Sequence, residues 1–367
     1  MIKGKQVGVA LITVMLIMAI GVVLATKMNS ALIFQIERTA NINSNQQAYW
    51  YAMGAEAFAK TVLSLSFKDD KDVTNLGQVW ASGETSFPVD LGSISGEISD
   101  LQSCFNLNSL KNQSEVSATD KDTEQNQSAP PSGPSANPPG TEKPEPPTRS
   151  NGNNTPSTRG QLAKDSFKEL VIALNIEGIS SFEAESMAES LYDWLDKDSA
   201  IVSAGGAEDN DYAAKKYPYL AANSLLASVN ELRLIEHFTP QAIFALKDHV
   251  CVIPNSDMHA ININTLDSEN PELLQALLGG VDQSKVDEIF SERGEDGFEK
   301  LSDFTAVQAV KDIQNFNLFK QQFVVDSDYF KLKTKTEFNE SYFSMNSIMK
   351  INKNQTITVV ERSIGAD

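Results

Sequence analysis

An apolar stretch near the N-terminus, from Val7 to Ala25, constrains the fold of this chain more than any other feature. The stretch contains no charged residue and is close to the roughly 20 residues that a helix needs to cross a bilayer. Lys3 and Lys5 precede it. Basic residues before a membrane helix hold that end in the cytoplasm, so we expect the rest of the chain on the other side of the membrane.

This apolar stretch is compatible with three kinds of N-terminus. It could be a signal peptide cleaved before Thr26, because Val23 and Ala25 are small enough for the positions before such a cut. It could be an uncleaved signal anchor. It could also follow a short basic prepilin-type leader that ends at Gly8, in which case cleavage before Val9 leaves the apolar helix on the mature protein.

The residues after the apolar stretch favour a retained helix. Residues 27–66 contain no proline and a single glycine, Gly54. We expect one long helix from about Val9 to Ser66, hydrophobic over residues 9–26 and amphipathic over residues 27–66. A single-span anchor with a helical stalk is the alternative. The prediction of one long helix rests on apolar residues that recur at helical spacing, namely Ala48, Ala52, Ala55, Ala59 and Val62.

The charge balance and the cysteines restrict the partners and the compartment. A formal net charge of −19 argues against a nucleic-acid partner, because phosphate binding requires a basic face. An acidic surface attracts cations, including Ca²⁺. The two cysteines, Cys104 and Cys251, could form one disulfide if the chain is exported, and would be unrelated thiols if it stays in the cytosol.

Residues 111–160 differ in composition from the rest of the chain. They hold nine of the fourteen prolines and are rich in Ser, Asn, Gly and Thr. Such a segment buries too little apolar surface to offset the entropy of ordering, so we predict a disordered insertion.

A weak internal repeat lies on either side of this segment. "NLNSL" (106–110) resembles "NINTL" (262–266), and each is followed by a helix, a glycine turn and another helix. The pattern resembles two small helical modules of the sterile-alpha-motif-like or helix-hairpin-helix kind within residues 106–319. A chance match of five-residue strings is the alternative. In the second copy, Asp282, Asp287 and Glu288 would repel a phosphate backbone, so we expect no nucleic acid there.

Six carboxylates gather between residues 193 and 211, in two groups separated by a short loop. Such groups can fold over one hard cation, which takes six to eight oxygen ligands at about 2.3–2.6 Å. The spacing is not that of an EF-hand, since the sixth position counted from Asp196 is Ile201 and the twelfth is Ala207. A solvated acidic loop is the alternative. The candidate ligands are Asp193, Asp196, Asp198, Glu208, Asp209 and Asp211.

An enzymatic interpretation of this stretch is a membrane-anchored, metal-dependent hydrolase. "DKDSA" suggests the Asp-x-Asp of haloacid-dehalogenase-type phosphatases, but that motif ends a buried strand, whereas "AESMAESLYDWL" has helical periodicity. His237, His249 and His259 show no metal-ligand spacing, and no nucleophile motif is present. The sequence therefore contains no catalytic constellation that we can identify.

The C-terminal segment predicts strands. Residues 323–361 alternate apolar and polar side chains between turn residues, which is typical of a three-stranded antiparallel meander. Residues 86–108 offer one or two more strands. We therefore expect an α+β fold, in which residues 67–105 and 320–367 form a sheet and residues 106–319 are inserted between its strands.

Several segments taken together resemble one family. They are "KQVGVALITVMLI", "QAYWYAMGAEAFA", "DLQSCFNLNSL", "LYDWLDKD", "GGAEDNDY", "ELRLI", "CVIP" and "ININT". The chain is similar in these to the K-type minor pseudopilin of the bacterial type II secretion system, over both ends and most of the middle except residues 111–160. Most pilin-like proteins have Glu as the fifth mature residue. Here that residue is Thr13, and its departure is itself a feature of the K-type proteins.

This resemblance implies a fold and a processing route. The fold would be that of a pseudopilin, with a long N-terminal helix packed on a small antiparallel sheet and a large inserted helical domain. Residues 1–8 would be a leader that prepilin peptidase removes between Gly8 and Val9, with N-methylation of Val9. The protein would then sit in the bacterial inner membrane as a single-pass protein with its C-terminal domain in the periplasm.

The resemblance also implies partners and ligands. The chain would be a non-enzymatic protein at the tip of the periplasmic pseudopilus, together with I-type and J-type minor pseudopilins. It would meet the major pseudopilin filament and the inner-membrane assembly platform. The six acidic residues from Asp193 to Asp211 would be candidate ligands for structural Ca²⁺. A periplasmic location would favour a disulfide between Cys104 and Cys251.

Overall fold

The computed structural model describes residues 9–69, 72–111, 159–339 and 341–365. The predicted leader, residues 1–8, lies outside the described residues. So does most of the predicted disordered insertion, since η2 (Leu107–Lys111) precedes the gap and α2 (Arg159–Ala173) follows it.

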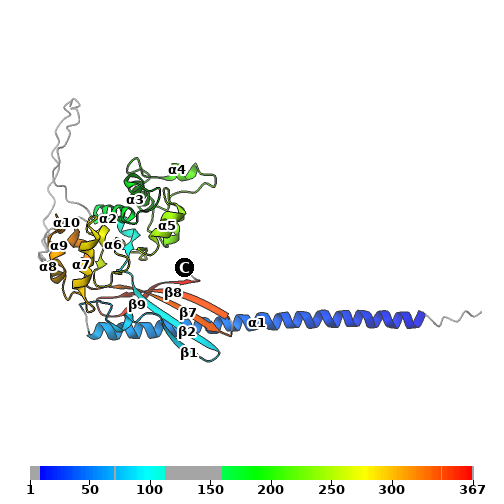
Figure 1. Ribbon diagram of the computed structural model, residues 1–367. Helices are drawn as coiled ribbons and strands as arrows, with labels where there is room; N and C mark the ends of the chain where they lie inside the picture. Colours follow the sequence, from blue (N-terminus) through cyan, green and yellow to red (C-terminus); the bar gives the residue numbers. More distant parts are fainter. Residues whose placement is uncertain (1–8, 70–71, 112–158, 340, 366–367) are drawn as a thin grey trace, which may run out of the picture.

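The chain begins with one long helix, α1, from Val9 to Asp69. Its N-terminal part is apolar on all sides, exposed, and projects far beyond the rest of the molecule (Figure 1). Among the described residues it is the one helix long and apolar enough to cross a membrane. The predicted long N-terminal helix is therefore confirmed, and it is consistent with a single-pass anchor.

The C-terminal part of α1 packs on a five-stranded antiparallel sheet. Residues at three- and four-residue spacing on one face of α1, including Ala52, Ala59, Leu63 and Phe67, are buried. The strand order is β1-β2-β7-β8-β9. The strands are β1 (Thr85–Val89), β2 (Gly92–Asp100), β7 (Tyr329–Phe338), β8 (Ser341–Ile351) and β9 (Ile357–Ile364).

This sheet agrees with the expected α+β arrangement. The three C-terminal strands form the predicted meander, and residues 86–108 supply two more strands of the same sheet. β2 pairs with β7 in register from Gly92 opposite Phe338 to Asp100 opposite Phe330. Because β2 and β7 are neighbours in the sheet, the helical region between them in sequence is an insertion.

A buried carboxylate fastens α1 to the edge of this sheet. Glu56 is 1% exposed and accepts hydrogen bonds from Arg362 Nε (2.6 Å), Arg362 Nη2 (2.9 Å) and Ser347 Oγ (2.9 Å). Lys60 Nζ lies 2.9 Å away. Burial alone would raise the pKa of Glu56, but the hydrogen bonds from Arg362, Lys60 and Ser347 outweigh it and lower the pKa to about 2. Glu56 therefore carries its charge with the counter-charges supplied by its own chain.

The inserted region is mostly helical and contains the largest apolar core of the described residues. In its later half, the single helix predicted over residues 284–304 is instead two helices, α7 (Gln283–Arg293) and α8 (Leu301–Ala306). The break lies at Gly294, whose φ is 63°. Its elements after η2 and α2 are α3 (Ser181–Leu195), α4 (Asp209–Ala213), η3 (Val229–Arg233), α5 (Pro240–Leu246), α6 (Glu272–Leu277), α7 (Gln283–Arg293), α8 (Leu301–Ala306), α9 (Gln308–Lys311), α10 (Phe316–Phe319) and η4 (Lys320–Gln322). Its short strands pair in parallel, β3 (Phe105–Asn106) with β4 (Val250–Cys251) and β5 (Ile261–Asn262) with β6 (Phe323–Val324).

The two asparagine-rich strings of the sequence repeat make equivalent contacts. Asn108 donates to the carbonyl of Leu226 (3.1 Å) and accepts from the N–H of Leu226 (2.8 Å). Asn264 does the same with Phe298, at 3.0 Å and 2.7 Å. In each string the preceding asparagine side chain accepts a hydrogen bond from the backbone N–H of the second. Each of these two buried side-chain amides therefore holds a loop that is distant in sequence against the first residues of its own half of the inserted region.

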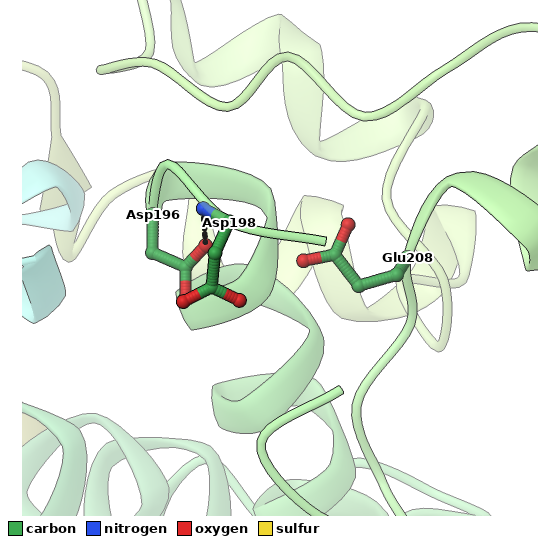
Figure 2. A group of neighbouring side chains, drawn as sticks. All are labelled: Asp196, Asp198 and Glu208. Atoms are coloured by element: carbon green, nitrogen blue, oxygen red, sulfur yellow. Dashed lines mark hydrogen bonds between the residues drawn. The ribbon is translucent and has the colours of Figure 1, made fainter. Parts of the chain in front are cut away.

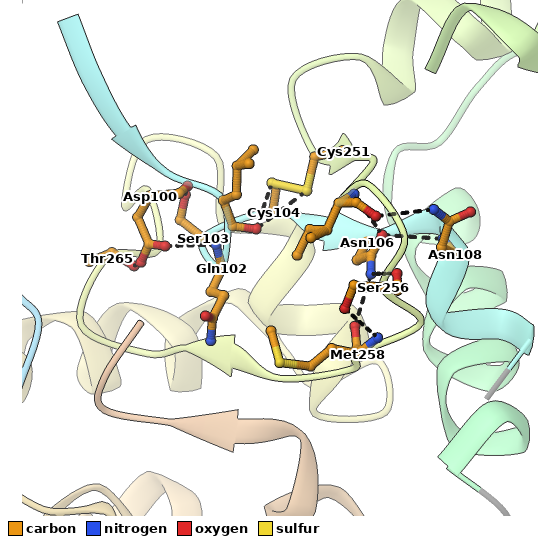
Figure 3. The surroundings of a disulfide bond; sticks show 12 residues. Asp100, Gln102, Ser103, Cys104, Asn106, Asn108, Cys251, Ser256, Met258 and Thr265 are labelled. Carbon is orange, nitrogen blue, oxygen red and sulfur yellow. Dashed lines mark hydrogen bonds between the residues drawn. A yellow bond between two sulfur atoms is a disulfide. The ribbon is translucent and has the colours of Figure 1, made fainter. Parts of the chain in front are cut away.

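A disulfide joins Cys104 to Cys251, near Asn106 of the first asparagine string (Figure 3). It connects the residue before β3 to β4, and 147 residues separate the two cysteines along the chain. On the sheet side, the buried Asp100 accepts hydrogen bonds from Ser327 Oγ (2.6 Å) and the Gln102 N–H (2.7 Å). Burial raises the pKa of Asp100 to about 6 against the effect of these donors.

Candidate metal centre

The acidic stretch begins at the end of α3, whose direction is fixed by its cap and its apolar face. Ser180 Oγ accepts a hydrogen bond from the N–H of Phe182, and the N–H of Ser180 donates to Glu183 Oε2 (2.9 Å). Met187 and Leu191 are buried in the core of the inserted region. The helix ends at Leu195, so its last turn and the residues that follow bring the first group of carboxylates to one place.

Three carboxylates of the stretch converge there. Asp196, Asp198 and Glu208 each offer an oxygen, and these oxygens all lie within 4.8 Å of one another. Figure 2 shows the Glu208 carboxylate directed from its own segment toward the two aspartates. Glu208 is 2% exposed, Asp196 is half-buried and Asp198 is exposed, so the cluster opens to solvent on one side.

The electrostatics of the cluster are unfavourable without a cation. Burial and the nearby carboxylate of Asp193 raise the pKa of Glu208 to about 7, against the effect of the Asp209 backbone N–H. Burial and Asp198 raise the pKa of Asp196. Both carboxylate oxygens of Glu208 are buried, and no described residue donates to them a hydrogen bond of good length and angle. A charged, buried carboxylate without well-formed hydrogen bonds lowers the stability of the fold unless a positive charge neutralises it.

A pair of glycines allows the loop to close over the carboxylates. A Cβ atom on Gly206 would lie 2.0 Å from Asp193 Oδ2, and one on Gly205 would lie 2.5 Å from Glu189 Oε2. A side chain at either position would force its neighbours to move, so glycine allows the backbone to pass this close. The chain then turns back and delivers Glu208 to the cluster.

The other three predicted ligands hold the loop. Asp193 is fully buried and its Oδ1 accepts a hydrogen bond from the N–H of Val202 (3.2 Å). Asp209 Oδ1 accepts from the N–H of Ala221 (3.0 Å). Asp211 Oδ2 accepts from the N–H of Glu208 (3.0 Å), at the start of α4. The structure therefore separates the six acids into three that converge and three that shape the backbone around them.

The donor set fits a hard cation. All three converging groups are carboxylates, and oxygen ligands suit Ca²⁺, Mg²⁺ or Mn²⁺ rather than softer metals. The buried oxygens of Glu208, which receive no hydrogen bond of good length and angle, are the observation that supports this fit. The cluster could thus hold a metal ion.

The histidines show no arrangement for catalysis. His259 is buried, its Nε2 lies 2.8 Å from Gln322 Oε1, and burial lowers its pKa to about 4. His249 is also buried, and burial lowers its pKa. His237 is exposed.

Two groups of functional interest could not be identified from the sequence. The Glu56–Arg362 pair joins residues that are 306 positions apart, and it depends on how β9 sits against α1. The similarity of the two asparagine strings was visible in the sequence. The hydrogen bonds by which Asn108 and Asn264 hold distant loops, called asparagine clamps below, were not. Of the predicted processing site, Val9 is exposed at the start of α1 and Gly8 lies outside the described residues.

The fold defines a class of protein. A long helix that is wholly apolar at its N-terminal end and packs its other end on an antiparallel sheet is the arrangement of a pilin-like filament subunit. This subunit carries a large helical insertion between β2 and β7 (Figure 1).

Comparisons with known proteins identify the family. Two family models, both described as type II secretion system protein K, match residues 103–255 and 261–326. Type II secretion system protein K of Aeromonas hydrophila is 32% identical, over 98% of this chain and 98% of that protein. The protein K of Dickeya chrysanthemi is 31% identical, over 98% of this chain and 97% of the relative. The chain belongs to the type II secretion system protein K family.

A solved structure agrees. The crystal structure of the GspK-GspI-GspJ complex from the type 2 secretion system of enterotoxigenic Escherichia coli contains a chain with a TM-score of 0.70 and 30% identity. The match covers 90% of this chain and all of that one. The protein is thus a minor pseudopilin of the type II secretion system, and its role is structural rather than enzymatic.

Proposed function

We propose that this minor pseudopilin forms the tip of the periplasmic pseudopilus together with I-type and J-type minor pseudopilins, and starts its assembly for the export of folded proteins. The observation that carries the proposal is the match to a chain solved in a GspK-GspI-GspJ complex. Two features support it. Thr13 lacks the carboxylate with which other pilin-like subunits meet a neighbour's terminal amine, and the helical insertion lies at the end of the molecule away from the start of α1 (Figure 1).

The proposed location and processing follow from α1. Prepilin peptidase would cut between Gly8 and Val9 and methylate Val9. The subunit would then wait in the bacterial inner membrane, with its C-terminal domain in the periplasm, for the assembly platform and the major pseudopilin filament. The mass of the mature N-terminal peptide tests this route. Methylated Val9 is the expected result, whereas a mature chain that begins at Thr26 or Met1 would contradict it.

A deletion strain tests the function itself. Without this chain, folded exoproteins should accumulate in the periplasm, and the wild-type chain supplied in trans should restore their export. Normal secretion in the deletion strain would contradict a role in starting the pseudopilus.

The inserted region is proposed to consist of two modules of the sterile-alpha-motif-like or helix-hairpin-helix kind. They lie within residues 106–319, with residues 67–105 and 320–367 supplying the sheet. The equivalent clamps made by Asn108 and Asn264 support a duplication. The break between the two family-model matches, after residue 255, also supports it.

The metal ion in the acidic cluster is proposed to be Ca²⁺ with a structural role. Asp196, Asp198 and Glu208 would bind the ion, while Asp193, Asp209 and Asp211 shape the loop around them. When bound, Ca²⁺ would supply the positive charge that the buried carboxylate lacks. Binding to the folded state alone would then stabilise the fold.

Thermal unfolding of the full-length protein in detergent, with and without added CaCl2, tests this assignment. Ca²⁺ should raise the Tm of the wild type and of the control Glu288→Gln, which changes an exposed acid on α7. It should raise the Tm of Glu208→Gln and Asp198→Asn much less. An undiminished Ca²⁺ response in Glu208→Gln would overturn the assignment.

A further inference from the structure

A cleft of about 1200 Å³ separates the sheet from the inserted region. Its floor is the face of β7, β8 and β9 that points away from α1, and its wall is formed by η3, α5 and the residues up to β4. In Figure 1, α5 lies above the end of the sheet where the chain terminates. The cleft is separate from the acidic cluster, because none of the three converging carboxylates lines it.

The floor of the cleft is polar and basic. Lys331 pairs with Ile348 and Lys333 with Asn346 across β7 and β8, so these four side chains share one face of the sheet. The opposite face carries Leu332, which packs in the core beneath α1. The alternation along β7 therefore directs two lysines into the cleft.

The wall of the cleft is apolar at α5. Ile243 and Phe244 line it, and Phe244 is 69% exposed. Lys247 Nζ lies over the Phe244 ring, 4.3 Å from its centre. An exposed aromatic ring at a cleft marks a surface that is stabilised when a partner covers it.

The charge of the cleft is opposite to that of the chain. Four cationic residues line it (Arg233, Lys247, Lys331 and Lys333) against two acids, Asp248 and Glu361, whereas the whole chain carries −19. Clustered basic residues within an acidic protein favour an acidic partner, by complementarity and by steering.

The floor and the wall of the cleft differ in character. The floor carries two lysines of β7, and the wall is apolar at α5. An extended segment points alternate side chains to opposite sides, which matches a basic floor and an apolar wall.

We propose that this cleft binds an extended acidic segment of a partner protein, in which acidic residues alternate with apolar ones. The segment lies between the floor and the wall, with its acidic side chains facing Lys331 and Lys333 and its apolar side chains facing Ile243 and Phe244. This binding surface goes beyond the proposed function and does not depend on the cation site.

Fluorescence anisotropy with the full-length protein in detergent tests the proposal. The probe is a fluorescein-labelled peptide as long as the eight residues of β9, in which Glu alternates with Leu. One control peptide replaces every Glu by Lys. A second has the same composition but groups the four Glu before the four Leu, which removes the alternation.

The alternating acidic peptide should bind at least about tenfold more tightly than either control peptide, a difference of roughly 1.4 kcal/mol. Its binding should weaken as salt is raised. The double variant Arg233→Glu/Lys333→Glu should abolish binding, while Lys216→Glu, on an exposed loop outside the cleft, should not. Phe244→Ala should weaken binding, while Phe182→Ala, which removes an equally exposed ring (68%) elsewhere, should not.

Three results would overturn the proposal. The first is an absence of binding by the acidic peptide at about 1 mM, the affinity range of the weakest specific contacts. The second is binding that the cleft variants leave unchanged. The third is a concentration-dependent dimer of the wild type that Arg233→Glu/Lys333→Glu dissolves, because it would assign the cleft to a second copy of this chain. Since none of these measurements involves Ca²⁺ or secretion, their failure is distinguishable from failure of the proposed function.

Discussion

Two buried glutamates, one in each part of the molecule, are stabilised in opposite ways. Glu56, between α1 and the sheet, and Glu208, in the inserted region, are 1% and 2% exposed. The pKa of Glu56 is lowered to about 2, because hydrogen bonds from Arg362, Lys60 and Ser347 outweigh its burial. The pKa of Glu208 is raised to about 7 by burial and by Asp193. The pilin-like part therefore completes its own charge balance, while the inserted region leaves the Glu208 carboxylate in a cluster of acids that could hold a metal ion.

This difference predicts different behaviour of the two parts. The α1–sheet unit neutralises its buried carboxylate with Arg362 and Lys60 of the same chain. The inserted region has an acidic cluster that could hold a metal ion. We expect the two parts to respond differently to reduction, to amide removal and to acid.

The disulfide should give the largest effect, and it should act on the inserted region. Replacing both Cys104 and Cys251 by Ser removes a link between residues 147 positions apart. The chain-entropy argument gives a loss of about 5 kcal/mol in the free energy of unfolding. Urea unfolding followed by hydrogen exchange should locate the loss around β3 and β4. Dithiothreitol should destabilise the wild type similarly and leave the double variant unaffected; a variant that still responds to it would refute the explanation.

Removal of the asparagine clamps should give the next largest effect, equal in the two halves of the inserted region. Asn108→Ala and Asn264→Ala each leave a buried backbone N–H and C=O unpaired, on Leu226 and Phe298. Each variant should lose about 3 kcal/mol of stability, measured by urea unfolding. Asn43→Ala, on the exposed part of α1, should change little. Costs that differ several-fold between the two clamps would argue against an equivalent role in a repeat.

Glu56→Gln should weaken the α1–sheet unit in a pH-dependent manner. The folded pKa of about 2 lies below the ordinary value of 4.5, so the stabilisation is complete above pH 4.5 and is lost as the pH falls from 4.5 to 2. The shift corresponds to roughly 3 kcal/mol at pH 7. The unfolding free energies of wild type and variant should differ at pH 7 and converge near pH 2. Glu37→Gln, at an exposed position of α1, is the control; a pH-independent difference between wild type and Glu56→Gln would show that packing, not charge, holds this interface.

The sequence predicted the parts of the molecule that depend on local periodicity. α1 and the β7–β8–β9 meander follow from helical spacing and from alternation within a few residues. The Glu56–Arg362 pair could not be predicted, because it depends on how β9 sits against α1, and that is set by packing across the whole sheet. The acidic stretch could be predicted only in part. Its composition indicated a cation site, but which acids converge depends on the path of the loop at Gly205–Gly206.

Replacing Gly54 of α1 by alanine should give the smallest change in stability. The same replacement at Gly206, in the inserted region, should have the opposite effect. Gly54 lies in α1, and a Cβ there meets no atom within 4 Å. Gly54→Ala should therefore stabilise the helix by up to about 1 kcal/mol, because alanine loses less conformational freedom on folding than glycine. Gly206→Ala, in contrast, places its Cβ 2.0 Å from Asp193 Oδ2, so it must displace either the loop or the carboxylate that accepts a hydrogen bond from the Val202 N–H.

The two alanine variants are compared by thermal unfolding with and without CaCl2. Gly54→Ala should raise the Tm slightly and keep the full response to Ca²⁺, whereas Gly206→Ala should lower the Tm and lose most of that response. A full Ca²⁺ response in Gly206→Ala would mean that the ion does not need Glu208 to be delivered by this loop. In that event the contrast between Glu56 and Glu208 would remain one of pKa alone, with no cation completing the second site.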